Sequence, residues 1–244
     1  MKRNMILSVV MDILILVLGR SVWSVPPVPV LQEENVEQAF ENVMPCAVRI
    51  QAGERYGSGS IYRLTVDEMI VVTAGHLISD CREELDITFM NGRMVKGRLV
   101  DVSDETDVGF IGISLADLSP EEMMQLRQVV INGSAYETLV KNSCFFMIDI
   151  VSDYDEPVYS QGAIVEREMF LPDYGRSMMY GDAYAHPGMS GCGIFDGYGH
   201  FVGILSGGTE HNEIAAVSLT DIEEAYRKTQ LIPLCKKQFT EGEN

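Results

Sequence analysis

Residues 182–196 read D-A-Y-A-H-P-G-M-S-G-C-G-I-F-D, and the other informative parts of the chain can be related to this stretch. Ser190 stands between Gly188 and Gly191, and Pro187 stiffens the approach to them. Glycines around one serine predict a tight turn that exposes the hydroxyl and lets a ligand come close to the backbone. Because a free serine hydroxyl is a poor nucleophile, the turn indicates catalysis only if the chain also supplies a base and an acid that orients the base.

Candidates for both partners lie upstream. His76 follows a buried apolar run in V-V-T-A-G-H-L, and Asp107 opens the apolar segment D-V-G-F-I-G-I. Asp101 and Asp104 are nearby alternatives, but only Asp107 opens an apolar strand, which predicts that its carboxylate is buried. Histidine, aspartate and serine in this order are typical of the chymotrypsin fold, whereas subtilisins and α/β-hydrolases have other orders.

Three segments around these residues resemble the trypsin-like serine proteases, most closely the HtrA/Deg branch. They are G-S-G-S-I before the histidine, V-D-V-S-D-E-T-D-V-G-F-I around the aspartate, and H-F-V-G-I-L-S-G-G after the serine. The resemblance covers residues 36–222. It implies an all-β fold of two antiparallel six-stranded β-barrels with short flanking helices, here without the PDZ domain that the branch usually carries.

The resemblance also implies a role for each residue. Ser190 would attack the scissile carbonyl, His76 would take up the serine proton and return it to the leaving amine, and Asp107 would hold the imidazole. The backbone N–H groups of Gly188 and Ser190 would form the oxyanion hole. Met189 departs from the family, which has Asp or Asn at this position, and so the geometry of the turn is open at the level of sequence.

The substrate-binding residues are likewise implied by the resemblance. Ser206, Gly207 and Gly208 would form the edge that pairs with the substrate backbone, with Ser206 also supporting the catalytic aspartate. Tyr184 falls where trypsin-like proteases have the floor of the specificity pocket, which predicts an uncharged, medium-sized or apolar substrate side chain. His186 is expected to shape the loop and to take no direct part in catalysis.

The composition narrows the class of partner. The chain has 244 residues with 18 basic and 36 acidic side chains, so that its net charge is −18. Such a balance argues against nucleic acid, whose phosphates require Lys and Arg. Solubility alone accounts for the charge, although it is compatible with basic substrates. We therefore expect protein or peptide substrates and no nucleic acid.

Residues 1–24 are expected to form a signal peptide or a membrane anchor. Lys2 and Arg3 give a positive start, and residues 5–18 are apolar except for Ser8 and Asp12. This run is shorter than the roughly 20 residues of a membrane span, so a cleaved signal peptide is favoured and an uncleaved tether is the alternative. Either reading predicts an extracytoplasmic protein, secreted or membrane-anchored.

The remaining chain is expected to hold one protease domain, preceded by a proline-rich linker and followed by a tail. Local signals add a glycine-rich turn, an Asn-Gly hairpin turn and three helices, the last opened by a capping box at Thr220. The expected boundaries are 25–35 for the linker, 36–230 for the domain, 47–115 for barrel one, 129–219 for barrel two, 221–228 for the last helix and 231–244 for the tail. The expected local elements are a helix over 32–44, a turn over 53–59, a hairpin turn at 91–92 and a helix over 120–127.

Five cysteines lie at positions 46, 81, 144, 192 and 235 without any C-x-x-C pair, so no zinc site is expected. We expect no metal and no cofactor. The sequence thus predicts a serine endopeptidase that acts through an acyl-enzyme. The alternative is a catalytically inactive trypsin-like homologue that binds peptides or partners, and the altered turn around Met189 and Cys192 keeps this alternative open.

Overall fold

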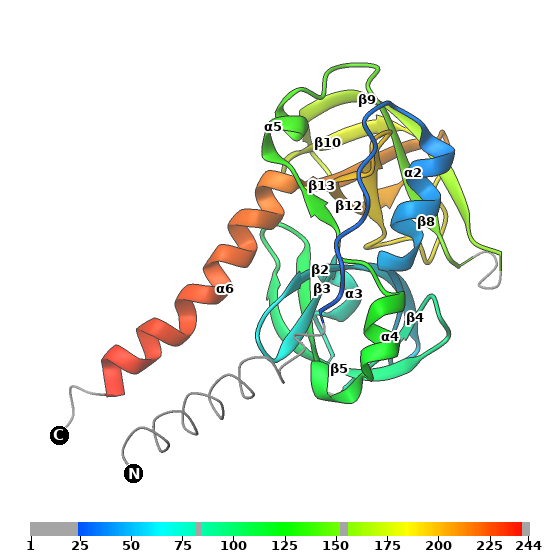
Figure 1. Ribbon diagram of the computed structural model, residues 1–244. Coiled ribbons are helices and arrows are strands. Elements are labelled where there is room, and N and C mark those ends of the chain that lie inside the picture. Colours follow the sequence, from blue (N-terminus) through cyan, green and yellow to red (C-terminus); the bar gives the residue numbers. More distant parts are fainter. Residues whose placement is uncertain (1–23, 82–83, 152–155, 241–244) are drawn as a thin grey trace, which may run out of the picture.

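The computed structural model describes residues 24–81, 84–151 and 156–240, so that the predicted leader lies almost wholly outside the described residues. Two β-structures lie one above the other, and the chain passes from the lower to the upper one after residue 126 (Figure 1). Helix α6 (Leu219–Thr240) projects away from both of them (Figure 1). None of the helices in the described parts of the chain is long and apolar enough to cross a membrane.

The first β-structure is a closed barrel in the order β1-β2-β3-β6-β5-β4. β3 has the sequence E-M-I-V-V-T-A and is buried from its second residue onward. Side chains on both of its faces are therefore covered by the rest of the protein. Neighbouring strands are antiparallel, and the pairing of β1 with β4 closes the ring. The strands are β1 (Ala47–Ala52), β2 (Arg55–Leu64), β3 (Glu68–Ala74), β4 (Leu85–Phe89), β5 (Met94–Ser103) and β6 (Val108–Ser114).

The second β-structure has six antiparallel strands in the order β11-β8-β9-β10-β13-β12, and β11 pairs again with β12. This pairing returns the sheet on itself, as expected for a second six-stranded barrel. A seventh strand, β7 (Val130–Ile131), adds to β12 in parallel, which the sequence did not predict. The six strands are β8 (Cys144–Asp149), β9 (Val158–Leu171), β10 (Arg176–Asp182), β11 (Gly193–Asp196), β12 (His200–Gly208) and β13 (Glu213–Ser218).

Aromatic side chains join the two barrels and the start of α6. The ring of Tyr62 on β2 lies 6.0 Å from that of Phe110 on β6, 6.0 Å from that of Phe201 on β12 and 5.5 Å from that of Tyr226 on α6. Tyr62, Phe110 and Phe201 are almost completely buried. Aromatic pairs in such contact contribute about 0.5–1.5 kcal/mol beyond the burial of their area. The relative position of the barrels is therefore fixed by dense packing, which a site built from both of them requires.

The prediction of a glycine-rich turn over residues 53–59 is wrong. The chain turns at residues 53–54, and Gly57 and Gly59 lie inside β2. A side chain at Gly57 would collide with Leu77 and lie 3.1 Å from the carbonyl oxygen of Ser190. These glycines therefore serve close packing between segments, a use of glycine that the sequence does not separate from a turn.

The residues expected to form a free linker belong to the fold. Val25 and Val28 are each only 3% exposed. The backbone around Pro27 runs parallel to Gln128 and hydrogen-bonds with it, so the segment lies along the connection between the two barrels. The domain therefore begins before residue 36.

The helices differ from expectation at their ends. α2 (Val36–Val43) begins at the Asn35 cap rather than at residue 32. α4 (Pro120–Gln125) has the predicted capping box, formed by Ser119 and Glu122. α6 is capped by Ser218, whose hydroxyl accepts from the N–H of Asp221, and not by the predicted capping box at residue 220. It continues to Thr240, into the expected tail.

Candidate active site

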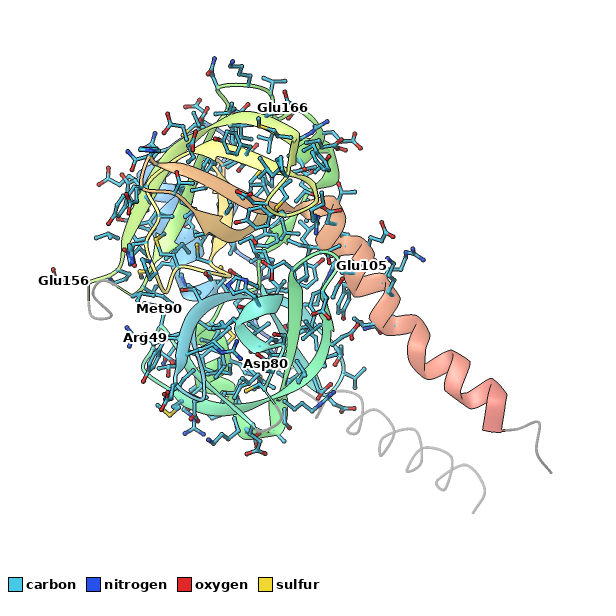
Figure 2. All side chains as sticks on the ribbon, turned by 180° about the vertical axis from the view of Figure 1, so that it is seen from behind. Arg49, Asp80, Met90, Glu105, Glu156 and Glu166 are labelled. Atoms are coloured by element: carbon cyan, nitrogen blue, oxygen red, sulfur yellow. The ribbon has the colours of Figure 1, made fainter. Side chains whose placement is uncertain are left out.

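The end of β3 positions His76. His76 lies in the short helix α3 (Gly75–Ile78), which directly follows the buried strand β3. The N–H of Gly75 donates to the backbone oxygen of Asp107 at 2.9 Å. A Cβ atom at Gly75 would lie 3.1 Å from the carbonyl carbon of Asp107, so a larger residue here would require a small shift of the two segments. Asp80, just after α3, lies on the face of the first barrel (Figure 2).

Asp107 precedes β6 and adopts a left-handed backbone conformation with φ +53°. Its Oδ1 accepts from the backbone N–H of His76 at 2.8 Å, and both carboxylate oxygens lie 3.0 Å from His76 Nδ1. Burial alone would raise the pKa of Asp107, but the hydrogen bonds from His76 and Ser206 outweigh burial and hold this pKa below its ordinary value. The carboxylate is thus ionised at neutral pH, and it contacts the His76 ring at Nδ1.

The hydrogen bond to Asp107 raises the pKa of the His76 ring above its ordinary value, against the opposing effects of partial burial and of Arg55. The His76 side chain is 51% exposed. Its Nε2 makes no hydrogen bond with any residue that the structure describes. The ring therefore has one nitrogen held by a carboxylate and one available to a proton donor.

Ser206 supports Asp107 through a bulge in β12. The pairing with β13 skips one residue between Leu205 and Gly207, which leaves Ser206 as the extra residue. Bulges re-aim a side chain relative to a regular strand. The hydroxyl of Ser206 donates to Asp107 Oδ2, and the residue is 5% exposed. The structure thus brings together His76, Asp107 and Ser206, three of the residues expected in the site.

The Ser190 turn packs against β2 and against β3, the strand that precedes His76. Gly188 and Gly191 have φ values of +98° and +83°, which only glycine adopts without strain. The N–H of Ser58 on β2 donates to the Ser190 backbone oxygen at 2.9 Å. A side chain at Gly191 would collide with the hydroxyl of Thr73, which lies on β3 three residues before His76. The predicted tight turn is therefore present and lies at the boundary of the two barrels.

Three groups in this turn have no partner among the described residues. The hydroxyl of Ser190 makes no hydrogen bond, to His76 or to any other described group. The N–H groups of Gly188 and Ser190, the expected oxyanion hole, likewise donate to no described acceptor. By contrast, the next N–H groups along the turn, those of Met189 and Gly191, donate to backbone oxygens. Two unengaged donors beside one unengaged hydroxyl can bind a substrate carbonyl.

The edge after Ser206 faces a cavity of about 390 Å³. Gly207 and Gly208 line it together with Tyr174, from the turn between β9 and β10. Tyr184 does not lie beneath a pocket, because its side chain is 60% exposed. The expectation of a pocket floor at Tyr184 is therefore not met, since the preceding strand β10 delivers this side chain to the surface.

Asp149 is a site residue that the sequence did not indicate. It ends β8 and is 6% exposed, and its Oδ2 lies 2.8 Å from His186 Nε2 in the loop before Ser190. The ring of His186 lies 5.9 Å from that of Tyr184. One signal was available: an aspartate at the end of a wholly apolar strand, C-F-F-M-I-D, which predicts a buried charge that needs a partner.

Among the described residues, no cluster of three or more His, Cys, Asp or Glu side chains is arranged to hold a metal ion. The described cysteines at 46, 81, 144 and 192 are unpaired. Cys192, two residues after Ser190, is buried, and burial raises the pKa of its thiol. This thiol is therefore neutral and inert as a nucleophile.

A family model for the trypsin-like peptidase domain matches residues 57–204, more than half of the chain. No curated protein matches the sequence at a significant level. Similar solved structures include an inactive serine-to-alanine mutant of Rv3671c from Mycobacterium tuberculosis, with a TM-score of 0.64, 13% identity, and coverage of 83% of this chain and 97% of that chain. Two others are a serine endoprotease from Yersinia pestis (TM-score 0.64, 20% identity, 81% and 67% coverage) and the HtrA-type protease AlgW with a decapeptide (TM-score 0.66, 14% identity, 80% and 67% coverage).

Proposed function

Since the chain belongs to the family of trypsin-like peptidase domains, we propose that it is a serine endopeptidase in which Ser190 is the nucleophile, His76 the base and Asp107 the orienting acid. The observation that carries this proposal is the difference between the two ring nitrogens of His76. Its Nδ1 lies 3.0 Å from the carboxylate of Asp107, and its Nε2 makes no hydrogen bond with a described group. A general base needs this arrangement, because one nitrogen must be fixed and the other must accept the serine proton.

The reaction proceeds in two halves. As Ser190 Oγ bonds to the scissile carbonyl carbon, its proton passes to His76 Nε2, and the oxyanion accepts hydrogen bonds from the N–H groups of Gly188 and Ser190. The C–N bond then breaks, and His76 gives its proton to the leaving amine. Water attacks the acyl-enzyme with His76 again as base, and the collapse of the second intermediate returns the proton to Ser190. Removal of one oxyanion-hole donor costs about 2.7–4 kcal/mol of transition-state stabilisation in a well-studied serine protease.

The sequence predicts an uncharged, medium-sized or apolar substrate side chain beside the scissile bond, and from the width of the gap at this edge we infer a small one. It would enter between the segment before Ser190 and the edge at Gly207 and Gly208. A Cβ atom at Gly208 would lie only 3.0 Å from the Cβ of Ala185, so these two segments nearly touch. Widening the gap with Ala185→Gly should extend the accepted side chains toward larger ones.

The substrates are proposed to be proteins or peptides that the chain meets outside the cytoplasm. Support comes from the family, and from the sequence of residues 1–24, which resembles a signal peptide. Intact-mass measurement of the exported protein tests this proposal. A mature chain that begins near Val25 is expected, and a membrane-bound chain that keeps its N-terminus would favour the tethered alternative.

The proposed function is tested with an unbiased peptide library, analysed by mass spectrometry after incubation with the wild-type chain or with Ser190→Ala. We expect new peptide termini with the wild type and none with the variant. The alternative function, an inactive homologue that binds peptides, predicts that the wild type retains peptides on a column without cleaving them. Cleavage that persists in the Ser190→Ala variant contradicts the assignment of the nucleophile.

A further inference from the structure

The ring of His186 contacts an oxygen acceptor on each side. Nε2 lies 2.8 Å from Asp149 Oδ2, and Nδ1 lies 3.0 Å from the backbone oxygen of Pro187. A carboxylate of an ionised Asp and a peptide oxygen accept hydrogen bonds and cannot donate them. Both ring nitrogens must therefore carry a proton for both contacts to be hydrogen bonds. A neutral ring would direct the lone pair of one nitrogen at an oxygen atom.

The oxygen that Nδ1 contacts belongs to the peptide that carries the N–H of Gly188. No peptide bond in the described residues is cis, so the carbonyl of Pro187 and the N–H of Gly188 point in opposite directions. A ring that holds the carbonyl therefore sets the direction of the N–H. On the other side of Gly188, its own backbone oxygen accepts from the hydroxyl of Ser58 at 3.1 Å. The two hydrogen bonds fix the peptides on both sides of Gly188.

We propose that His186 is a positioning residue, held as an imidazolium between Asp149 and the carbonyl of Pro187, and that it turns the N–H of Gly188 toward the oxyanion. This inference rests on the proposed function, because an oxyanion forms only if Ser190 attacks a carbonyl. Met189 is completely buried at the position where an acidic or amide side chain was expected, so it cannot hold the loop by a charge. The buried charge of Asp149 acts instead, through His186.

Other groups around the pair are compatible with a charged ring. Arg49 on β1 donates to the backbone oxygen of Ile150, next to Asp149, at 3.0 Å. Figure 2 shows Arg49 beside the boundary of the two barrels, on the side where Glu156 lies. The Cys192 thiol is kept neutral by burial and by the charge of Asp149. Burial disfavours the charged form of His186, but the hydrogen bonds to Asp149 and Pro187 raise its pKa above the ordinary value.

The proposal predicts two opposite effects of pH on turnover. His76 must lose its proton to act as a base, so the rate rises through the pKa of His76. His186 must keep its proton, so the rate falls at higher pH, where its Nδ1 would become an acceptor facing the Pro187 oxygen. Removal of one oxyanion donor lowers kcat by about 10²–10³ in a comparable enzyme, which is the upper limit of this effect.

The experiment measures kcat and KM across pH for the full chain, for Asp149→Asn and for His186→Gln, with a peptide that the wild type cleaves. In Asp149→Asn, we expect the alkaline limb to move to lower pH while the acid limb stays in place. In His186→Gln, kcat should fall by up to about 10²–10³ with little change in KM, and the alkaline limb should disappear. His200→Gln is the matched control, because His200 forms a separate pair with Asp196, and its profile should equal that of the wild type.

An alkaline limb at the same pH in the wild type and in Asp149→Asn would overturn the proposal. A second measurement does not depend on activity: the titration of the His186 ring by NMR in the folded Ser190→Ala chain. A ring that keeps both protons above pH 6.5 supports the proposal, and a ring that loses one below pH 6.5 overturns it. An inactive wild-type chain with a high His186 titration would refute the proposed function alone, so the two failures are distinguishable.

Discussion

Two of the His–Asp pairs in the described residues, one from each barrel, differ in what the second ring nitrogen contacts. In the first barrel, Asp107 holds His76 by Nδ1, and Nε2 has no described partner. In the second barrel, Asp149 holds His186 by Nε2, and Nδ1 contacts a backbone oxygen. A ring with one unengaged nitrogen can take up and release a proton, whereas a ring with two acceptors is committed to its charged form.

The two histidines also differ in how far their side chains are exposed to solvent. The side chain of His76 is 51% exposed, whereas that of His186 is 18% exposed. Distance alone does not separate the pairs, because both have nitrogen–oxygen contacts of about 3 Å. The comparison teaches that the function of a His–Asp pair is decided by the partner of the other nitrogen.

Replacing His76 should have the largest effect of any change in either pair. In His76→Ala, no base remains for Ser190, and kcat should fall by about 10⁶, as for the catalytic histidine of a comparable protease. Steady-state hydrolysis of a cleaved peptide measures this effect. If His186→Gln lowers kcat more than His76→Ala does, the two roles have been assigned the wrong way round.

The second largest effect is expected for Asp107, the proposed orienting acid. Asp107→Asn should lower kcat by about 10⁴, since an amide favours the wrong tautomer of His76. Asp104→Asn is a control of the same chemistry three residues away, and its activity should stay close to that of the wild type. A larger loss in Asp104→Asn would show that the wrong carboxylate was chosen.

A smaller effect is expected for the residue that supports Asp107. Ser206→Ala removes a hydrogen bond to a charged group, and such bonds contribute about 1.5–3 kcal/mol, so kcat/KM should fall roughly 10- to 100-fold. Ser206→Thr keeps the hydroxyl and should restore most of the activity. Equal activities of the alanine and threonine variants would mean that this hydrogen bond does not matter for the reaction.

The smallest effect concerns stability, and it separates the pairs without any catalysis. The folded-state pKa values of His76 and His186 are raised above 6.5. The stabilisation by each pair is therefore complete below pH 6.5 and is lost as the pH rises through the folded-state pKa. Thermal unfolding of Ser190→Ala should show this loss, and adding His186→Gln should remove more of it than adding His76→Gln, because His186 is less exposed. Equal contributions of His76 and His186 to the pH-dependent loss of stability would contradict the argument that the less exposed pair contributes more.

Much of the fold was predictable because its signals are local. Alternating apolar strands, the Asn91-Gly92 hairpin turn and the capping box at Ser119 each depend on neighbouring residues, and all three are present in the structure. The glycines of β2 were misinterpreted because their reason lies elsewhere in the chain, in the side chain of Leu77 and the backbone of Ser190. No local pattern carries that information.

The site shows the same limit. His76, Asp107 and Ser190 were predicted from their motifs, and the structure brings the first two into hydrogen-bond contact. Asp149 was missed because its partner, His186, is far away in sequence and meets it only when β8 and the Ser190 loop fold together. The exposure of Tyr184 could not be predicted either, since it depends on where the preceding strand ends.

The central claim is that His76 activates Ser190 for attack on a carbonyl. Labelling with a fluorophosphonate, followed by intact-mass measurement and peptide mapping, tests this claim most directly, because the reagent reacts with an activated serine and not with an ordinary hydroxyl. The account predicts one adduct per chain, at Ser190, that is absent in Ser190→Ala and strongly slowed in His76→Ala. A wild-type chain that stays unlabelled at neutral pH, or an adduct that forms equally fast without His76, would contradict it.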